Sequence, residues 1–352
     1  MVSGYFFLQN KNLFFNRLSE VKALEKIKTR NKYAKYGYLF SLPFIITFLT
    51  FTFYPIFHTI RISFSDLQGV ASADFNFHSN LLQNYIDMLN NLTFRTALRN
   101  TLFLWIFNFI PQIVLAVTLA AWFTNKRLNL KKSGIFKTLF YMPNIITAAS
   151  VAILFGALFG APIGPLNDLF IRLGFLDSPT HFFRSAATAR GTVMFIQFWM
   201  WYGSTMIVMI AGINGISPTL FEAAAIDGAN ALQTFFKVTL PQLKPIALFT
   251  LVTSFIGGMQ MFDIPHLLVD RSGPDNATLT IGVFIYNQAF GPSRMWNRAA
   301  AASVILLVMC AIIVAALFLT FWLWGKVSTA LKKAALDKMK ENSMTALKEG
   351  NA

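Results

Sequence analysis

The chain has 352 residues, of which 55% are hydrophobic and only 13% are charged, and 38 of them are Phe. Because a soluble domain could not bury so much apolar surface, this composition excludes an ordinary soluble protein and favours one whose solvent is the lipid bilayer. The net charge of +15 does not indicate a nucleic-acid-binding protein, since the basic residues are spread over separate segments instead of one folded surface.

Six stretches of the sequence are long and apolar enough to cross about 30 Å of hydrocarbon as helices, which takes about 20 residues each. Unpaired backbone groups cannot face lipid, and no stretch shows the alternation of a transmembrane β-strand, so helices are the expected solution. We therefore predict an all-α, polytopic transmembrane bundle. The expected spans cover residues 37–60, 98–123, 135–160, 189–213, 243–268 and 299–324.

The expected membrane domain, residues 37–324, lies between two basic tails at 1–36 and 325–352. Its first apolar run is too long for a cleaved signal and lacks a small-residue cleavage site, so we expect it to stay as an anchor. With the N-terminus inside, every Lys falls in the tails or in the loops at 124–137 and 214–244, whereas the outer loops carry only Arg. Basic residues accumulate on the cytoplasmic side, which predicts that both termini are cytoplasmic.

Both tails have apolar residues at helical spacing among Lys and Arg, so each is interpreted either as an amphipathic helix on the anionic inner leaflet or as a solvated tail. The second and third outer loops, 161–188 and 269–298, are rich in Pro, Gly, Asp and Asn, which favours turns over further helices. Four prolines inside the expected spans are expected to kink their helices. They are Pro43, Pro55, Pro111 and Pro143.

The segment between the fourth and fifth expected spans carries the most specific pattern of the chain. Residues Glu222 to Ala229 read Glu-Ala-Ala-Ala-Ile-Asp-Gly-Ala. Ser217 and Pro218 before them favour a helix start, since serine caps helix N-termini and proline is tolerated at the first helical position. The run of Glu and Ala is helix-forming and slim, so this helix could enter a groove on a partner. Gly228 permits the sharp turn that ends it.

A second amphipathic helix is expected from Ala229 to Leu240, where Pro241 and Pro245 would end it before the fifth span. The two short helices would form an elbow on the cytoplasmic side that could carry force into the fourth and fifth spans. Taken singly, each of these features is an ordinary helix cap or helix breaker. Their combined order and spacing distinguish this segment much more specifically than any one of them does.

This joint pattern resembles the coupling loop, or EAA loop, of the membrane subunits of ATP-binding cassette (ABC) importers. The resemblance covers about residues 36 to 325 and is to the carbohydrate-importing branch of maltose and multiple-sugar permeases, which Tyr141-Met-Pro143 and Met261-Phe262-Asp263 also match. It implies the ABC importer permease fold, with coupling to an ATPase through the loop at 214–245. The implied coupling residues are Glu222, Ala223, Ala224, Asp227, Gly228, Leu240 and Pro241.

The resemblance also implies a set of partners and a place in the cell. They are a second homologous permease subunit, two cytoplasmic ATPase subunits, an extracytoplasmic solute-binding protein and the bilayer of the bacterial cytoplasmic membrane. The chain would then be a transport subunit that passes an oligosaccharide or related polyol inward. It contains no Gly-x-x-x-x-Gly-Lys-Ser/Thr phosphate loop, and its four His lie far apart, so we expect no ATP hydrolysis, cofactor or metal ion in this subunit.

Polar and aromatic residues inside the fourth and fifth spans are the candidates for solute contact, because a sugar is held by hydrogen bonds and an aromatic face. Analogy with the maltose-type permeases points to the same spans. The predicted substrate path comprises Gln197, Trp201, Ser204, Ser254, Gly258, Gln260 and Asp263. For Asp263 the alternative is capping or pairing with an outer Arg, and for Trp201 it is packing or an interfacial position.

Two other classes of protein remain as alternatives. A secondary carrier driven by an ion gradient would need paired acids or cations buried within the membrane, and the expected spans show almost none. A membrane-embedded enzyme would need His, Asp or Glu clustered near one face, and the sequence shows no such cluster.

Overall fold

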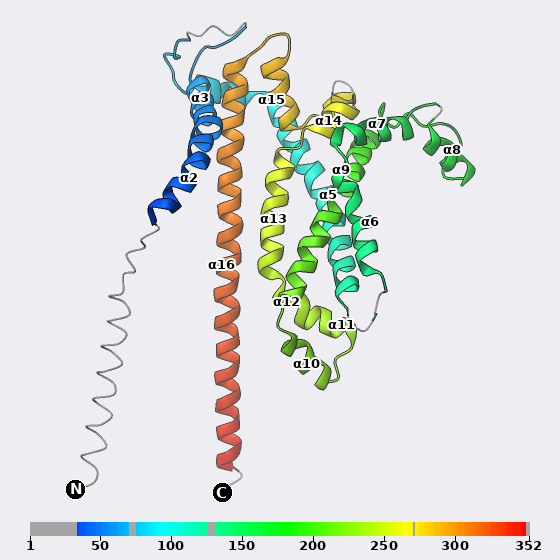
Figure 1. The fold of residues 1–352 in the computed structure, drawn as a ribbon, viewed down its shortest axis with the longest axis vertical. Helices are drawn as coiled ribbons and strands as arrows, with labels where there is room; N and C mark the ends of the chain where they lie inside the picture. The colour runs from blue at the N-terminus through cyan, green and yellow to red at the C-terminus, as the bar shows by residue number, and fades with distance from the viewer. Residues whose placement is uncertain are drawn as a thin grey trace, which may run out of the picture. The chain divides into compact units, whose positions relative to one another are not determined.

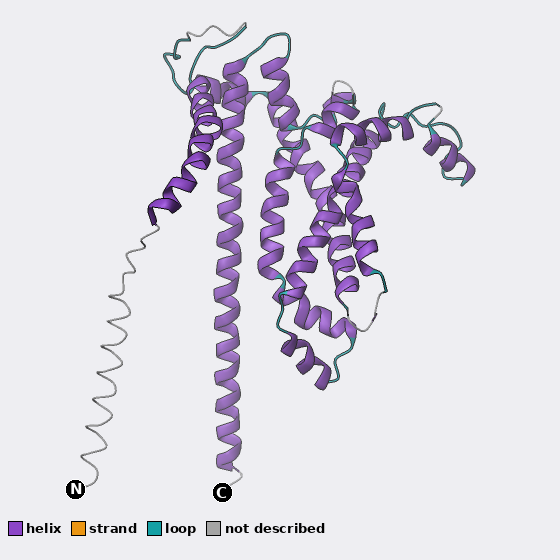
Figure 2. Ribbon diagram, viewed as in Figure 1, coloured by secondary structure: helices purple, strands orange, loops and turns teal. Residues whose placement is uncertain are grey.

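The computed structural model describes residues 34–69, 75–125, 128, 131–162, 164–269 and 272–349. The basic tail predicted at 1–36 falls almost wholly outside the described residues. Within the described segments helices dominate, and Figure 2 shows no strand there. The β-type pairing found among them is an isolated antiparallel bridge between Ser65 and Phe77.

The helices of Figure 1 follow one another along the chain with short connections. In order they are α2 (Ala34–Phe48), η1 (Leu49–Phe53), α3 (Tyr54–Ser63), α4 (Gln83–Asn90), α5 (Leu92–Thr124), α6 (Ser133–Ile145), α7 (Ala148–Leu158), α8 (Pro165–Arg172), α9 (Ala186–Asn214), α10 (Pro218–Ile226), α11 (Ala231–Thr234), η3 (Phe235–Thr239), α12 (Leu240–Gln242), α13 (Lys244–Met259), α14 (Asp263–Leu268), η5 (Pro274–Asn276), α15 (Ile281–Phe290) and α16 (Trp296–Glu349). Of these, η1 and η3 are π-helical and η5 is a 3-10 turn.

Five helical segments of the described chain are long and apolar enough to cross a membrane, which confirms the prediction of a polytopic helical bundle. They are Tyr36–Ser63, Leu92–Thr124, Ala186–Asn214, Lys244–Leu268 and Trp296–Val327. A sixth crossing results if α6 and α7, which are bent by 91° relative to each other, count as one span. The span expected at 135–160 is therefore two helices. The bend follows Pro143, and Thr147 caps the second helix by accepting a hydrogen bond from the Ser150 amide at 3.3 Å.

The described residues up to Thr59 and those from Ile60 onward form two compact units. In the first unit, α2, η1 and the start of α3 follow without a break, and apolar side chains such as Phe40 and Phe51 are exposed. The π-helical turn η1 ends at Phe53, two residues before Pro55. A proline ring collides with the carbonyl four residues earlier, here that of Phe51, and a widened turn at this place accommodates the ring without ending the helix.

The centre of the second unit is the packing of α5 along α9, with α6 against α9 and α13 against α5 (Figure 1). α5 continues through Pro111 as one helix. The inner half of this packing is filled by apolar residues that include Leu119, Met206 and Leu243. At Gly203, a Cβ atom would lie 2.3 Å from the carbonyl oxygen of Phe140, so the missing side chain allows α6 to approach α9 closely.

The end of the bundle that carries α4, α8, α14 and α15 is opposite the end that carries α10 (Figure 1), and the charge distribution predicts that it is the outer end. There, α7 and α14 pack on α9 through a cluster that includes Phe155, Ile196 and Ile264. A second cluster, which includes Met88, Phe94 and Phe284, joins α4, α5, α15 and α16.

The prediction that the second and third outer loops contain turns without further helices is wrong, because α8 and α15 lie in them. A proline and a capping threonine start these helices instead. Pro165 occupies the first turn of α8 directly after Gly164, and the Thr280 hydroxyl caps α15 by accepting from the Val283 amide at 3.4 Å.

The last helix, α16, runs without interruption from the outer end into the C-terminal tail predicted at 325–352. Near the inner end of its apolar part, Lys244 Nζ lies 5.3 Å from the ring centroid of Trp324, and Lys326 Nζ lies 3.8 Å from that of Trp322. Trp and Lys at a common level are typical of a membrane interface, where the indole is half immersed and the ammonium group reaches water.

Candidate functional site

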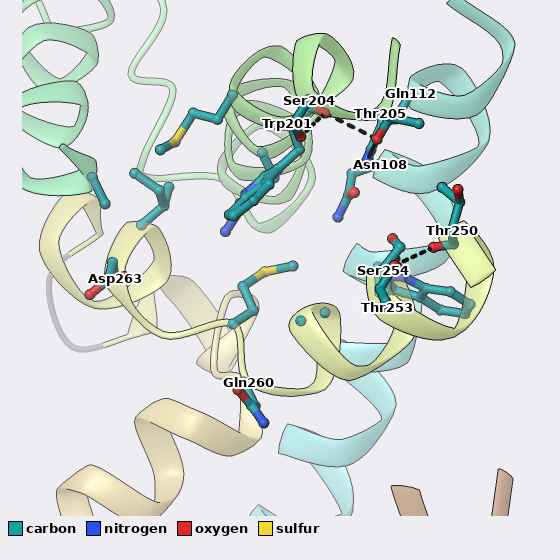
Figure 3. Close-up of a pocket in the computed structure, with 18 of the residues that line it drawn as sticks. Asn108, Gln112, Trp201, Ser204, Thr205, Thr250, Thr253, Ser254, Gln260 and Asp263 are labelled. Carbon is teal, nitrogen blue, oxygen red and sulfur yellow. Dashed lines mark hydrogen bonds between the residues drawn. The ribbon is translucent and has the colours of Figure 1, made fainter. Parts of the chain in front are cut away.

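A cavity of about 440 Å³, called the inner cavity below, opens between α5, α9, α13 and the start of α14 (Figure 3). This volume falls within the range of about 300–1,000 Å³ that is usual for small-molecule sites. The fold brings all seven residues of the predicted substrate path into its wall, although they come from different helices. They are Gln197, Trp201, Ser204, Ser254, Gly258, Gln260 and Asp263. Their contact with solute stays a prediction.

The sequence interpretation missed one wall of the inner cavity, which α5 supplies. Asn108 and Gln112 of α5 are both buried, and Gln112 Nε2 donates to Thr205 Oγ1 of α9 at 2.7 Å. Asn108 Nδ2 donates to the Leu104 carbonyl of its own helix at 2.9 Å. Two amides one helical turn apart in an apolar span share one face of the helix, and this spacing is the signal that could have revealed them.

Trp105 of α5 connects this wall to α13. Its Nε1 donates to Ser254 Oγ at 3.2 Å, and its ring packs edge-on against Phe255 with 5.2 Å between ring centroids. A Cβ atom on Gly258 would lie 2.2 Å from Trp105 Cδ1. Gly258 therefore shapes the cavity by leaving room for the indole, and Ser254 orients that indole.

The α9 wall offers an aromatic face. Trp201 is 49% exposed, and Figure 3 shows its indole reaching into the inner cavity. The hydroxyl of Ser204 donates to the Trp201 carbonyl at 3.0 Å, and that of Thr205 donates to the same oxygen at 3.2 Å. Gln197, one turn earlier on α9, is buried. This wall combines a flat apolar surface with amide and hydroxyl groups.

At the outer rim of the inner cavity, Asp263 is exposed and forms the first residue of α14. A carboxylate in this position interacts favourably with the partial positive charge of a helix N-terminus, which fits the capping alternative. Gln260 is exposed and points away from the other labelled side chains in Figure 3. Among the described residues that line the cavity, Asp263 alone carries a formal charge.

The second candidate site is the elbow at the inner end of the bundle, formed by α10, α11, η3 and α12. α10 begins at Pro218 and ends at Ile226, and Gly228 follows in the left-handed region with φ +72°. An L-residue with a side chain is strained there, so glycine suits this turn. Ser217 makes no capping hydrogen bond to the helix, and its Oγ lies 2.8 Å from Thr219 Oγ1.

The second arm of the elbow differs from the single helix expected at 229–240. It begins only at Ala231, after a capping box in which Asn230 Oδ1 accepts from the Gln233 amide at 2.8 Å and Gln233 Oε1 accepts from the Asn230 amide at 2.9 Å. The π-helical turn η3 follows, and the arm then continues through Pro241. As at Pro55, the widened turn lies where the proline ring would otherwise meet a carbonyl.

Six of the seven predicted coupling residues are exposed on the elbow: Glu222, Ala223, Asp227, Gly228, Leu240 and Pro241. Ala224, by contrast, is buried against its own chain. Three strongly exposed apolar side chains lie beside them, and two of these, Ile226 and Leu232, were not singled out by the sequence interpretation. The three are Ile226, Leu232 and Phe236, which are between 60% and 86% exposed. Exposed apolar side chains concentrated on one short element mark a contact surface, so coupling through this face stays a consistent prediction.

The elbow packs against α9 and leads directly into α13, and both of these helices line the inner cavity. Leu243, which directly follows α12, is 1% exposed and packs in the cluster that contains Met209 and Ile213 of α9. A Cβ atom on Gly212 of α9 would lie 2.9 Å from Leu243 Cδ2, so the contact is close. α13 starts at Lys244, and a displacement of the elbow would therefore act on α9 and α13 together.

Comparison with known proteins finds relatives that are membrane components of transport systems. Residues 85–329 match the family described as binding-protein-dependent transport system inner membrane component. The arabinooligosaccharides transport system permease protein AraP of Bacillus subtilis (strain 168) is 33% identical over 77% of this chain and 84% of its own length. The lactose transport system permease protein LacF of Rhizobium radiobacter is 31% identical over 79% of this chain and 91% of its own.

Among solved structures, the chain is similar to one from a bacterial alginate ABC transporter in complex with alginate pentasaccharide-bound periplasmic protein. The TM-score is 0.69 at 22% sequence identity, and the match covers 83% of this chain and 96% of that one. At this identity the likeness is one of fold.

Proposed function

The chain belongs to the family of binding-protein-dependent transport system inner membrane components, and from this premise we propose that it conducts a neutral oligosaccharide or related polyol. It is a multi-pass inner-membrane protein and a transport subunit of an ABC importer. The observation that carries the proposal is the inner cavity, where amides, hydroxyls and one exposed indole from three spans surround a single space.

The chemistry of this wall favours uncharged sugars. Amide and hydroxyl groups exchange hydrogen bonds with sugar hydroxyls, and the Trp201 face suits the apolar side of a sugar ring. No Lys, Arg or His lies among the described residues of the wall, so it offers no cation to a uronate, and Asp263 would repel one. Relatives named for arabinooligosaccharides and lactose agree with a neutral substrate.

We further propose that the chain works with a second permease subunit, two cytoplasmic ATPase subunits and an external solute-binding protein. The description of the family supports dependence on a binding protein, and the alginate transporter was solved with a periplasmic protein. The exposed apolar side chains of the elbow support a protein partner on the inner face, because such side chains gain free energy when they are covered.

In the proposed mechanism, ATP-driven closure of the ATPase subunits displaces α10. The displacement passes through η3 and α12 to Leu243, which is packed against α9 and directly precedes α13. Because α9 and α13 also form two walls of the inner cavity, their movement changes which side of the membrane the cavity faces. ATP binding thus favours one of two arrangements of the same cavity.

The proposal is tested with the complete importer in proteoliposomes. Uptake of arabinotriose, lactose, maltotriose and an alginate trisaccharide is measured with the binding protein outside and ATP inside. We expect ATP-dependent uptake of at least one neutral saccharide and none of the alginate trisaccharide. Uptake that needs an imposed ion gradient and no ATP would support the secondary-carrier alternative instead.

A further inference from the structure

A second cavity, of about 460 Å³ and called the outer cavity below, lies at the outer end of the bundle among the start of α5, α14, α15 and the connection between these last two. α14 contributes to both cavities, with Asp263 and Ile264 in the wall of the inner one and His266 in that of the outer one. The polar side chains of the outer wall are Asn91, Thr93, His266, Asn276, Asn287 and Gln288, together with Ser272.

The outer wall has the chemistry of a site for polyhydroxylated ligands. Its described residues include no carboxylate and no Lys or Arg, so it offers little to a small ion, whereas amides and hydroxyls both donate and accept hydrogen bonds. The buried Phe284 adds an aromatic surface. The outer wall therefore repeats the combination of amide, hydroxyl and aromatic groups found in the inner cavity.

One atom of the outer wall lacks a partner. Gln288 Oε1 is buried, and no group in the described part of the chain donates a hydrogen bond to it. A buried acceptor without a donor costs about 1–3 kcal/mol. Gln288 also lines the outer cavity, so a rotation of its amide that brings Oε1 to the wall would let a ligand hydroxyl supply the missing donor and remove this cost.

A short aromatic stack connects the walls of the two cavities. The His266 ring stacks on Phe262, a residue of the inner wall, with 4.8 Å between centroids and 21° between planes, and it lies 4.8 Å from the Tyr286 ring. Met261, the neighbour of Phe262, is bonded to the start of α15, because Thr280 Oγ1 donates to the Met261 carbonyl at 2.7 Å. At Gly282, a Cβ atom would lie 3.0 Å from the same oxygen, so α15 approaches closely.

We propose that the outer cavity is a second saccharide subsite, which holds a sugar unit of a neutral oligosaccharide on the outer side of the Phe262, His266 and Tyr286 stack. The inference rests on the proposed function, because it assigns the same class of solute to a second place on its route. An oligosaccharide entering from outside would occupy the outer cavity first and would reach the inner cavity when the stack moves.

The test uses the complete importer and the single cysteine of the chain, Cys310, which is replaced by Ser. Asn287→Cys then places a thiol in the outer wall, and Ser293→Cys places one on an exposed position outside both cavities. Both are labelled from outside with a polar maleimide, in the presence of arabinotriose, lactose, maltotriose or an alginate trisaccharide. By mass action, a saccharide present at twice its dissociation constant should slow labelling of Asn287→Cys about threefold.

The alginate trisaccharide is expected to give no protection, and labelling of Ser293→Cys is expected to be the same with every saccharide. Gln288→Leu added to Asn287→Cys should abolish the protection, while the melting temperature stays the same or rises because an unpartnered acceptor has been removed. A saccharide that is taken up but does not protect Asn287→Cys overturns the subsite alone. If no saccharide of the panel is taken up, both proposals are overturned.

Discussion

Gly257 and Gly258 are adjacent residues of α13 that both line the inner cavity, yet they differ in the space around them. A Cβ atom on Gly258 would lie 2.2 Å from Trp105 Cδ1, whereas one on Gly257 would meet nothing within 4 Å. Gly258→Ala is therefore expected to displace the indole from Ser254 and to lower the free energy of unfolding by about 1–3 kcal/mol, as overpacking does. Thermal unfolding of the purified chain measures the effect.

Gly257→Ala is the matched control for this substitution. It is expected to leave the melting temperature unchanged or to raise it slightly, since alanine is a better helix former than glycine by about 0.5–1 kcal/mol. Equal melting temperatures for the two variants would show that Trp105 does not occupy the space beside Gly258.

The hydrogen bond from Gln112 to Thr205 joins α5 to α9 inside the apolar bundle. Such bonds between membrane helices contribute about 0.6 kcal/mol on average and up to about 1.7 kcal/mol. A double-mutant cycle with Gln112→Leu and Thr205→Val, measured by unfolding in detergent, should give a coupling energy in this range. The control cycle uses Thr118→Val, because the Thr118 hydroxyl bonds to Val114 of its own helix. Equal coupling in the two cycles would contradict this interaction.

At the level of single residues, the sequence was informative about the two spans that the coupling loop joins. Polar and aromatic residues of α9 and α13 stood out because they are uncommon in apolar helices, and the fold places them around one cavity. It was not informative about Trp105, Asn108 and Gln112, because only long-range packing decides that α5 lies beside α9. Gly258 was predicted to lie near solute, and it lines the inner cavity, but its close approach to the Trp105 ring could not be foreseen.

Among the elements, the elbow depends on the turn at Gly228. Proline cannot adopt its φ of +72°, and it lacks the amide that donates to the Ala225 carbonyl at 3.1 Å. In the purified importer, Gly228→Pro should leave the subunits assembled but remove the stimulation of ATP hydrolysis by solute-loaded binding protein. Gly215→Ala, at the end of α9 where φ is −79°, should retain it. Stimulation that persists in Gly228→Pro would contradict coupling through this turn.

The capping box gives the second arm of the elbow a defined start. Asn230→Ala removes the side chain that accepts from the Gln233 amide, and such losses cost about 0.5–2 kcal/mol. Amide hydrogen exchange over Ala231–Thr234 is therefore expected to become faster in Asn230→Ala. Asn230→Ser, which keeps a capping oxygen, should exchange nearly as slowly as the unaltered chain. Equal exchange in the two variants would mean that the cap does not hold this arm.

Prolines limit what the sequence reveals about these elements. A rule that ends helices at proline predicts a break at Pro241, but a π-helical turn before it keeps the arm continuous, as another does before Pro55. Near Pro143 the opposite occurs, and α6 and α7 diverge by 91°. Local sequence allows either outcome, and the packing of α7 on α14 and α9 selects the bend.

For the whole molecule, composition and charge already predict a polytopic helical protein and its orientation, because both depend on the transfer of side chains between water and lipid. The outer cavity could not be predicted in this way. Its wall combines residues as far apart in the sequence as Asn91 and Gln288. The cavity therefore forms only when α5, α14 and α15 pack together. The packing of Leu243, which links the elbow to the helices of the inner cavity, likewise could not be predicted without the folded structure.

The central claim is that the elbow faces the cytoplasm and receives work from an ATPase subunit. It is tested most directly in the importer with Cys310→Ser, by placing Asp227→Cys on the elbow and Ser293→Cys at the outer end. We expect Asp227→Cys to react only from the cytoplasmic side and to form a crosslink with the ATPase subunit, and Ser293→Cys to react only from outside. Labelling of Asp227→Cys from outside, or no crosslink to any nucleotide-hydrolysing subunit, would contradict the account.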